Sequence, residues 1–269
     1  MGRIILKRLL AALPNLAGVI VVTFLLTRAI PGDPAAYFAG ASASTEAVEQ
    51  IRQQLGLDKP LIEQFFRYVA ALARGDLGLS LTTGQPVLQE LLMRLPASLE
   101  LVLLALLLAC AIAIPLGVAA ATRPGSWIDQ LARLVTTAGV SLPTFFTGLL
   151  LAYVFYFLLG WAPSPLGRLD PMFSPPPTVT GLYLIDAALA GDRALWWAAF
   201  KQLILPVLTM TLFVLAPIAR MTRASMLAVL SSDFVRTARA SGLGRGTVLV
   251  RYALRNALLP VVTTLGMVF

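Results

Sequence analysis

Long uncharged segments recur along the chain and predict membrane-spanning helices. Leu9 to Thr27 contains nineteen residues without a charge, Leu101 to Thr122 contains twenty-two, and Leu134 to Gly167 contains thirty-four. A helix needs about 20 predominantly apolar residues to cross a bilayer. The pattern therefore predicts spans within residues 1–30, at about 101–122 and at about 134–160.

Two later segments are shorter. Residues 202–219 form an uncharged stretch of eighteen that carries Pro206 and Pro217, which membrane helices tolerate because neighbouring groups satisfy the freed carbonyls. This stretch predicts a fourth span. Residues 256–269 are fourteen uncharged residues, too few to cross at about 1.5 Å per residue. They are interpreted as the start of a fifth span, which is either re-entrant or belongs to an incomplete chain.

The charges of the connections predict the orientation of the spans. Residues 1–8, 122–133 and 219–255 together hold twelve Lys and Arg against two acids, whereas the rest of the chain holds nine against eleven. Basic loops stay on the cytoplasmic side. We therefore expect a cytoplasmic N-terminus and external segments at 31–97 and 161–201. This topology accounts for the net charge of +8 better than nucleic-acid binding does.

The composition limits the chemistry of the chain. Hydrophobic residues make up 58% of it and charged residues only 13%. One cysteine, Cys110, and no histidine exclude an internal disulfide, a Cys/His zinc cluster and a triad with a histidine base. The sequence predicts an all-α polytopic membrane protein that binds no metal and no cofactor of its own.

The external segment 31–97 carries signals for two helices. After the turn-forming run Pro31-Gly32-Asp33-Pro34, Thr45 is a candidate N-cap for a helix over Glu46–Leu55, and Gly56 is its terminator. A second amphipathic helix is predicted over Leu61–Arg74. The expected result is a small helical cap on the outer face.

The cytoplasmic loop 220–255 contains the densest polar pattern. Ser232 or Asp233 is a candidate N-cap, Gly242 a left-handed terminator, and Thr247 the cap of a following helix. A two-turn helix is not stable alone. It must pack either on the protein's own membrane domain or on another protein, so docking is one interpretation and a basic loop against anionic lipid is the other.

This loop resembles the EAA loop of ABC importer permeases. Arg236-Thr237-Ala238 stands in the EAA place, Gly242 is its glycine and Leu259-Pro260 closes it. The leading Glu of the motif is missing, and the gap from Gly242 to Leu259 is longer than in its commonest form. In both features the loop resembles that of the dipeptide/oligopeptide branch. Further motifs of that branch follow in order: Pro31-Gly32-Asp33-Pro34, Leu55-Gly56-Leu57-Asp58, Gly75-Asp76-Leu77-Gly78, Arg94-Leu95-Pro96-Ala97, Ile114-Pro115-Leu116-Gly117 and Ser141-Leu142-Pro143.

The resemblance implies a permease core over 98–269 in an importer that carries di- or oligopeptides. Its partners would be a second permease subunit, two cytoplasmic ATPases that bind the ATP, and an external substrate-binding protein. Permeases of this branch usually have a complete fifth and a sixth span, so we expect the chain to lack roughly its last fifth. The implied ATPase-coupling residues are Asp233, Val235, Arg236, Thr237, Ala238, Arg239, Ala240, Ser241, Gly242 and Leu243.

Four residues at or inside the spans are candidates for a translocation path or gate. Arg28 and Glu100 lie at outer span ends, where charges either mark a path or extend to the interface. Pro115 and Pro143 are candidate kinks. The span interiors lack the ionisable groups that usually couple secondary transporters to ions, which favours an ATP-driven permease over a secondary transporter or channel, and over a membrane enzyme.

Overall fold

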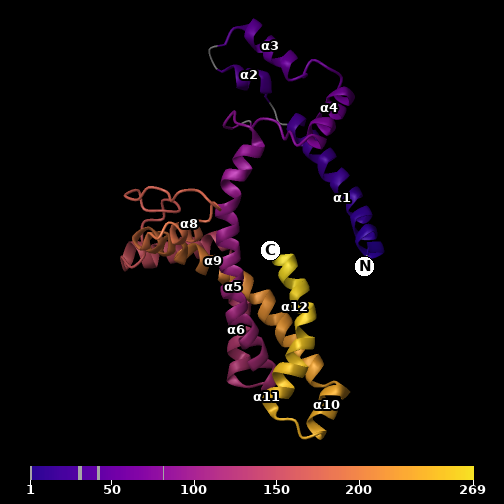
Figure 1. Cartoon of the computed structure of the whole chain (residues 1–269), viewed down its shortest axis with the longest axis vertical. Helices are drawn as coiled ribbons and strands as arrows, with labels where there is room; N and C mark the ends of the chain where they lie inside the picture. The colour runs from indigo at the N-terminus through magenta and orange to yellow at the C-terminus, as the bar shows by residue number, and fades with distance from the viewer. Residues whose placement is uncertain (1, 30–31, 41–42, 81) are drawn as a thin grey trace. The chain divides into compact units, whose positions relative to one another are not determined.

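The structure is a computed structural model that describes residues 2–29, 32–40, 43–80 and 82–269. In these residues the regular elements are helices and one isolated bridge between Leu79 and Pro86. The chain divides into two compact units, Met1–Arg94 and Leu95–Phe269. Among the described residues, four helices are long and apolar enough to cross a membrane: Ile5–Ala29, Val87–Thr122, Arg193–Leu230 and Arg245–Val268. A bent pair, Trp127–Gly139 and Thr144–Leu158, adds a fifth if it is one span. The prediction of an all-α polytopic fold is confirmed (Figure 1).

In the described residues before Val87, the first unit contains one long helix and three short ones. They are α1 (Gly2–Ala29), α2 (Pro34–Ala39), α3 (Thr45–Gln54) and α4 (Leu61–Ala73). Ser44 caps α3 by accepting a hydrogen bond from the Ala47 N–H at 3.2 Å, so the predicted cap at Thr45 is wrong by one residue. Asp33 caps α2, while Pro31 of the predicted turn lies outside the described residues.

The second unit holds the remaining elements. They are α5 (Val87–Thr122, which begins in the first unit), α6 (Trp127–Ser141), α7 (Thr144–Ala152), the π-helix η1 (Tyr153–Leu158), α8 (Tyr183–Leu189), α9 (Arg193–Leu230), α10 (Asp233–Ala240), α11 (Arg245–Thr247), the π-helix η2 (Val248–Leu254) and α12 (Arg255–Val268). The last three are consecutive and run as one helical stretch of 24 residues.

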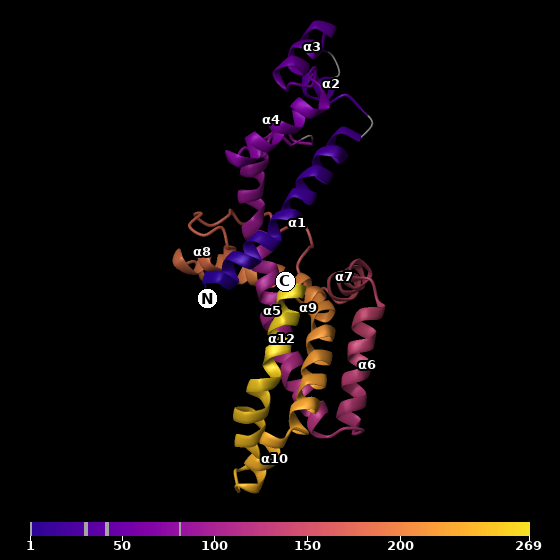
Figure 2. The same ribbon diagram turned by 90° about the vertical axis from the view of Figure 1, so that its right-hand side faces the viewer.

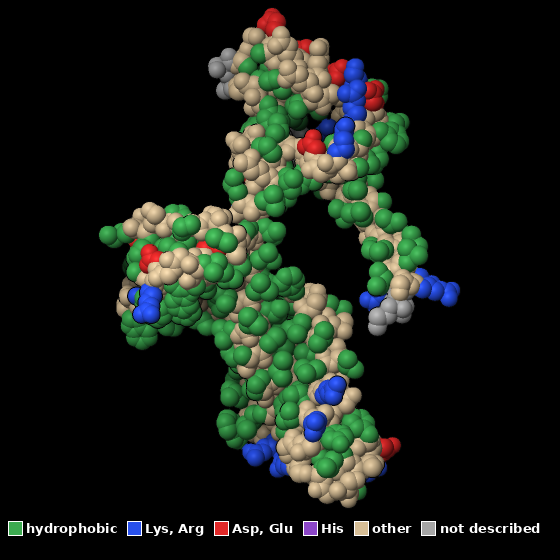
Figure 3. Space-filling model, viewed as in Figure 1, with side chains coloured by type: hydrophobic (Ala, Val, Ile, Leu, Met, Phe, Trp, Pro, Cys, Tyr) green, Lys and Arg blue, Asp and Glu red, His purple; other side chains and the backbone are tan. Residues whose placement is uncertain are grey.

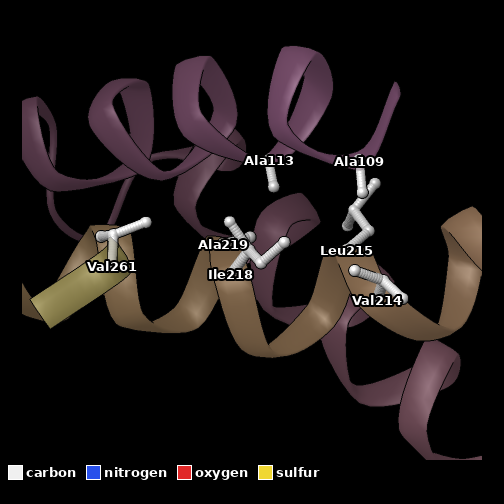
Figure 4. Packing of buried hydrophobic residues seen from close by; sticks show 7 residues of the cluster. All are labelled: Ala109, Ala113, Val214, Leu215, Ile218, Ala219 and Val261. Atoms are coloured by element: carbon white, nitrogen blue, oxygen red, sulfur yellow. The ribbon is translucent and has the colours of Figure 1, made fainter. Parts of the chain in front are cut away.

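Alanines packed against larger apolar side chains form the core of the second unit. Ala109 and Ala113 of α5 face Leu215 and Ile218 of α9, and Val261 of α12 completes the cluster (Figure 4). These side chains are almost fully buried. Small residues such as these alanines let membrane helices approach closely, and this close packing provides contact energy where lipid supplies no hydrophobic driving force.

The predicted span at 134–160 is broken at Pro143, the residue predicted as a candidate kink. The helix stops at Ser141 and resumes at Thr144, and the two parts are bent by 98°. Leu142 adopts φ −96° and ψ 130°. Proline disfavours the helical conformation in the residue before it, so Pro143 explains the break. Both α6 and α7 pack against α9 (Figure 2).

Two other predicted boundaries change. The span at 202–219 is the middle of α9, which has 38 residues and contains both Pro206 and Pro217. Residues 220–230 of the predicted loop are therefore helical. The segment 256–269 belongs to the 24-residue helical stretch that begins at Arg245, which is long enough to cross a membrane, so the prediction that it is too short is wrong. The uncharged segment was counted from Asn256, but the helix begins at Arg245 and includes the charged Arg251 and Arg255.

Candidate coupling surface

The short helix α10 follows directly after α9. Ser232 stands at its N-cap in an extended conformation, with φ −74° and ψ 153°, and its hydroxyl donates to the Val229 carbonyl. Asp233 lies in the first turn and Arg239 in the last, the placement that complements the helix dipole. The predicted helix between residues 232 and 242 is confirmed, but neither predicted cap residue, Ser232 or Asp233, makes a side-chain capping hydrogen bond.

One face of α10 is buried against the membrane core. Val235 has no exposed surface and Ala238 is also buried, three residues further on the same face. They pack in one cluster with Met226 of α9, Val248 and Ala253 of η2, and further small residues of α5 and α12. The protein's own core therefore supplies the packing that a two-turn helix requires.

The opposite face of α10 is exposed and polar. The side chains of Asp233 and Arg236 are 93% and 78% exposed and approach to 3.3 Å. Such a surface pair contributes little to stability. The Thr237 hydroxyl donates to the Asp233 carbonyl at 3.0 Å, so it is bound within the helix. The exposed members of the predicted site are Asp233, Arg236, Thr237, Arg239, Ala240, Ser241, Gly242 and Leu243.

Gly242 ends α10 in a left-handed conformation. Its φ is +76°, its N–H donates to the Arg239 carbonyl, and the Leu243 N–H donates to the Ala238 carbonyl at 3.4 Å. These are the two bonds of a Schellman motif. The predicted terminator is confirmed. Thr247, in contrast, lies inside the next helix with φ −62°, so its predicted role as a cap is wrong; Gly244 occupies the N-cap position.

A cavity of about 460 Å³ lies beside α10. It is lined by Thr122, Leu230, Arg239, Leu243, Arg245, Val248 and Leu249. Lys and Arg side chains gather at the end of the second unit that α10 and α11 form (Figure 3). The short helix thus presents a basic, partly hollowed surface at the end of the long helix α9.

The four path candidates belong to elements other than α10. In the first unit, Arg28 donates to the Gln64 side chain at 2.8 Å and lies over the Phe24 ring. Pro115 lies inside α5, and Pro143 stands at the bend before α7. Their role in a path stays a prediction.

Glu100 of α5 is buried and holds the loop that precedes α8. It accepts from Arg168 at 2.8 Å and from the Leu184 N–H at 2.8 Å, while Arg168 also lies over the Tyr183 ring. Asp186, two residues after Leu184, is also buried. It accepts hydrogen bonds from the N–H and hydroxyl of Thr180 and from the Gly181 N–H. Burial alone would raise the pKa of Asp186, but these hydrogen bonds outweigh it and lower the pKa.

Sequence reasoning missed one group altogether. Asp129 appeared only as a minor acid in a basic loop, yet its side chain is fully buried and accepts from Arg133 and Arg223. Arg223 is 94 residues away along the chain. The spacing of Asp129 and Arg133 by four residues was visible, but a single sequence gave no sign of the partner on α9.

Comparison with known families assigns the chain. Residues 113–269 match the binding-protein-dependent transport system inner membrane component, and residues 1–102 match the N-terminal part of the membrane component of such systems. The chain belongs to this family. Its members are the permeases of ABC importers, which work with a substrate-binding protein and ATPase subunits, and the chain is accordingly a multi-pass inner-membrane permease. The predicted family is confirmed.

Several relatives extend over most of the chain. It is 50% identical to the probable D,D-dipeptide transport system permease protein DdpB of Escherichia coli K12, over 93% of this chain and 74% of that one. It is 40% identical to the dipeptide transport system permease protein DppB of Alkalihalophilus pseudofirmus, over 97% and 78%. It is 37% identical to the glutathione transport system permease protein GsiC of Escherichia coli O6:H1, over 98% and 77%.

Proposed function

We propose that this permease imports short peptides, and that the exposed face of α10 is the surface to which an ATPase subunit binds. The names of the relatives mention D,D-dipeptide, dipeptide and glutathione transport. These substrates share a small size and amide bonds. Support for the peptide class rests on these three relatives together.

The two-faced burial of α10 is the observation that carries the ATPase surface. Val235 and Ala238 anchor the helix on α9 and η2, so it keeps its shape without a partner. The polar residues on the other face are then available for contact. A helix that is rigid on one side and exposed on the other transmits a push from a bound protein to the spans behind it, which is what an ATP-driven permease needs.

The orientation follows from the charges. Twelve Lys and Arg lie in residues 1–8, 122–133 and 219–255, and the α10–α11 end of the second unit is basic. The positive-inside rule places this end and the N-terminus in the cytoplasm. In this arrangement the ATPases bind the nucleotide, and this chain binds no cofactor.

A second, different permease subunit completes the proposed importer. Large apolar side chains are exposed along α1, α5 and α7, among them Leu16, Leu107 and Leu149. Lipid and a second permease are the two surroundings that accept such surfaces in a membrane. A heterodimer of permeases is the arrangement that the resemblance to the dipeptide/oligopeptide branch implies.

Purification of the tagged permease from native membranes in mild detergent tests the proposal. We expect ATPase subunits and a second permease to co-purify, and the reconstituted complex to take up labelled dipeptide only with ATP and binding protein. Recovery of the chain alone, with uptake that ignores ATP, would contradict the proposal and favour a secondary transporter.

A further inference from the structure

A buried carboxylate joins α6 to α9. The Asp129 side chain in the first turn of α6 has no exposed surface. Arg223 of α9 donates to it twice, from Nε to Oδ1 at 2.6 Å and from Nη2 to Oδ2 at 2.9 Å. Arg133 Nη2 and the Gly125 N–H also donate to Oδ2, at 2.7 Å and 3.0 Å. We call Asp129, Arg133 and Arg223 the α6–α9 clamp.

The clamp lies one helical turn from the packing beneath α10. Met226 follows Arg223 by three residues on α9 and is fully buried in the cluster that contains Val235 and Ala238. Residues three apart on a helix lie on the same side. A displacement of α10 therefore reaches Arg223 through one turn of α9.

Close packing continues along α6 beyond the clamp. A Cβ atom on Gly139 would lie 2.8 Å from the Leu212 carbonyl oxygen, so the α6 and α9 backbones nearly touch there. Thr136, between the clamp and Gly139, is buried. The bend at Pro143 comes directly after this contact. The clamp and Gly139 together join α9 to the helix that leads into the bend.

The acidic and the basic residues of the clamp differ in their access to a cavity. A cavity of about 310 Å³ lies beside the clamp. Its lining residues are Gly117, Ala132, Arg133, Thr136, Thr137, Ala219, Arg220, Arg223 and Ala224. Arg133 and Arg223 therefore line this space, whereas Asp129 is enclosed. Separating α6 from α9 would take both Arg223 hydrogen bonds away from the Asp129 carboxylate and leave it only Arg133 and the Gly125 N–H, and losing a partner of a buried ion pair is unfavourable. The clamp accordingly resists separation of the two helices.

We propose that the α6–α9 clamp makes the bent α6–α7 segment move together with α9 when the ATPases act on α10. Asp129 is a positioning residue in this account, since it acts through α9. The proposal rests on the proposed function, because it assigns the path by which the binding of an ATPase reaches the membrane helices.

Peptide uptake per ATP hydrolysed, measured with the complete importer in liposomes, tests the clamp. We expect Asp129→Asn to leave assembly intact and to lower this ratio about tenfold, within the range of coupling between distant sites. Arg220→Gln is the matched control, because Arg220 lines the same cavity but makes none of the clamp's hydrogen bonds. An unchanged ratio in assembled Asp129→Asn overturns the clamp, while absence of ATP-driven uptake in the unmodified importer overturns the proposed function instead.

The exchanged pair, Asp129→Arg with Arg223→Asp, provides a second test if Asp129→Asn fails to assemble. The exchange alone would put an arginine four residues from Arg133, so Arg133→Gln is combined with it, and one arginine on α6 then meets one carboxylate on α9. Recovery of assembly and of the uptake ratio supports the clamp. An exchanged pair that assembles with a ratio as low as that of either single variant overturns it.

A distance measurement in the otherwise unmodified importer decides the case in which neither variant assembles. Spin labels at Leu134→Cys on α6 and Met221→Cys on α9 are feasible because both side chains are exposed and Cys110 can be replaced by Ser. We expect the same distance in nucleotide-free and ATP-bound importer. A distance that changes between the two states overturns the clamp.

Discussion

Replacement of Gly242 perturbs the angle at which α10 leaves the core. Gly242 has φ +76°, and no atom lies within 4 Å of the position that a Cβ would occupy, so a side chain there meets open space. The effect of Gly242→Ala is therefore confined to the backbone. Gly242→Val acts in the same way and more strongly, because β-branched residues resist positive φ.

The size of the effect follows from the left-handed conformation. It costs an L-residue roughly 1–2 kcal/mol, and Asn tolerates it better. If the ATPase requires the native turn, its affinity falls by about five- to thirtyfold in Gly242→Ala. The ATPase affinity of Gly242→Asn should lie between those of the unmodified permease and Gly242→Ala. The affinity of Gly242→Val should be lower than that of Gly242→Ala.

The assay is the affinity of the purified ATPase for the permease in detergent, with membrane insertion checked by the yield of folded permease. Gly244→Ala is the matched control. Gly244 has φ −58°, which Ala adopts without strain, and no atom lies within 4 Å of its Cβ position. We expect this variant to bind like the unmodified permease.

Equal ATPase affinity in Gly242→Ala, Gly242→Val and the unmodified permease would refute the reasoning. It would mean that the left-handed turn only ends the helix. Loss of affinity in Gly244→Ala as well would show that any side chain in this loop interferes, and the positive φ of Gly242 would not explain the effect.

Three further predictions concern buried groups. Val235→Ala removes two methyl groups from a fully buried position and should lower the free energy of unfolding by about 2 kcal/mol, whereas exposed Thr237→Ala should lower it much less; thermal unfolding in detergent measures both. Glu100→Gln weakens the ion pair with Arg168, so it should lower the free energy of unfolding by about 3 kcal/mol and speed hydrogen exchange in residues 168–182. Glu90→Gln weakens a pair with the exposed Arg94 and should have neither effect. Because the folded state lowers the pKa of Asp186, its carboxylate stabilises the loop fully above the unfolded pKa of about 3.9, and this contribution disappears as the pH falls through the lower folded value. Hydrogen exchange of residues 179–181 should therefore be faster in Asp186→Asn than in the unmodified protein at neutral pH and should converge in strong acid; equal rates at neutral pH would contradict the assignment.

Local signals in the sequence predicted the elements that local chemistry determines. Gly242 and Gly56 end helices where glycine was expected, and the helix at Leu61 begins as predicted. Charge-free length also identified the first two spans. Length alone reports neither a bend nor a helix that extends past its charges, so the bend was indicated only by Pro143 as a candidate kink, and the start of the last helix at Arg245 was missed.

The candidate site was predicted in part for the same reason. The N-cap and terminator of α10 are local, so its position was correct. Which face is buried depends on Met226 and Val248, and the clamp depends on Arg223 meeting Asp129 across 94 residues. Contacts between distant segments leave no periodic pattern in one sequence, and only the folded chain brings them together.

Site-specific photo-crosslinking from α10 in native membranes tests the central claim most directly. A crosslinking residue at Thr237, on the exposed face, should capture an ATPase subunit, and one at Trp127, exposed at the start of α6, serves as the control. The account predicts ATPase adducts from Thr237 that are absent or much weaker at Trp127. Adducts with lipid alone from Thr237, in membranes where the importer is active, would contradict it.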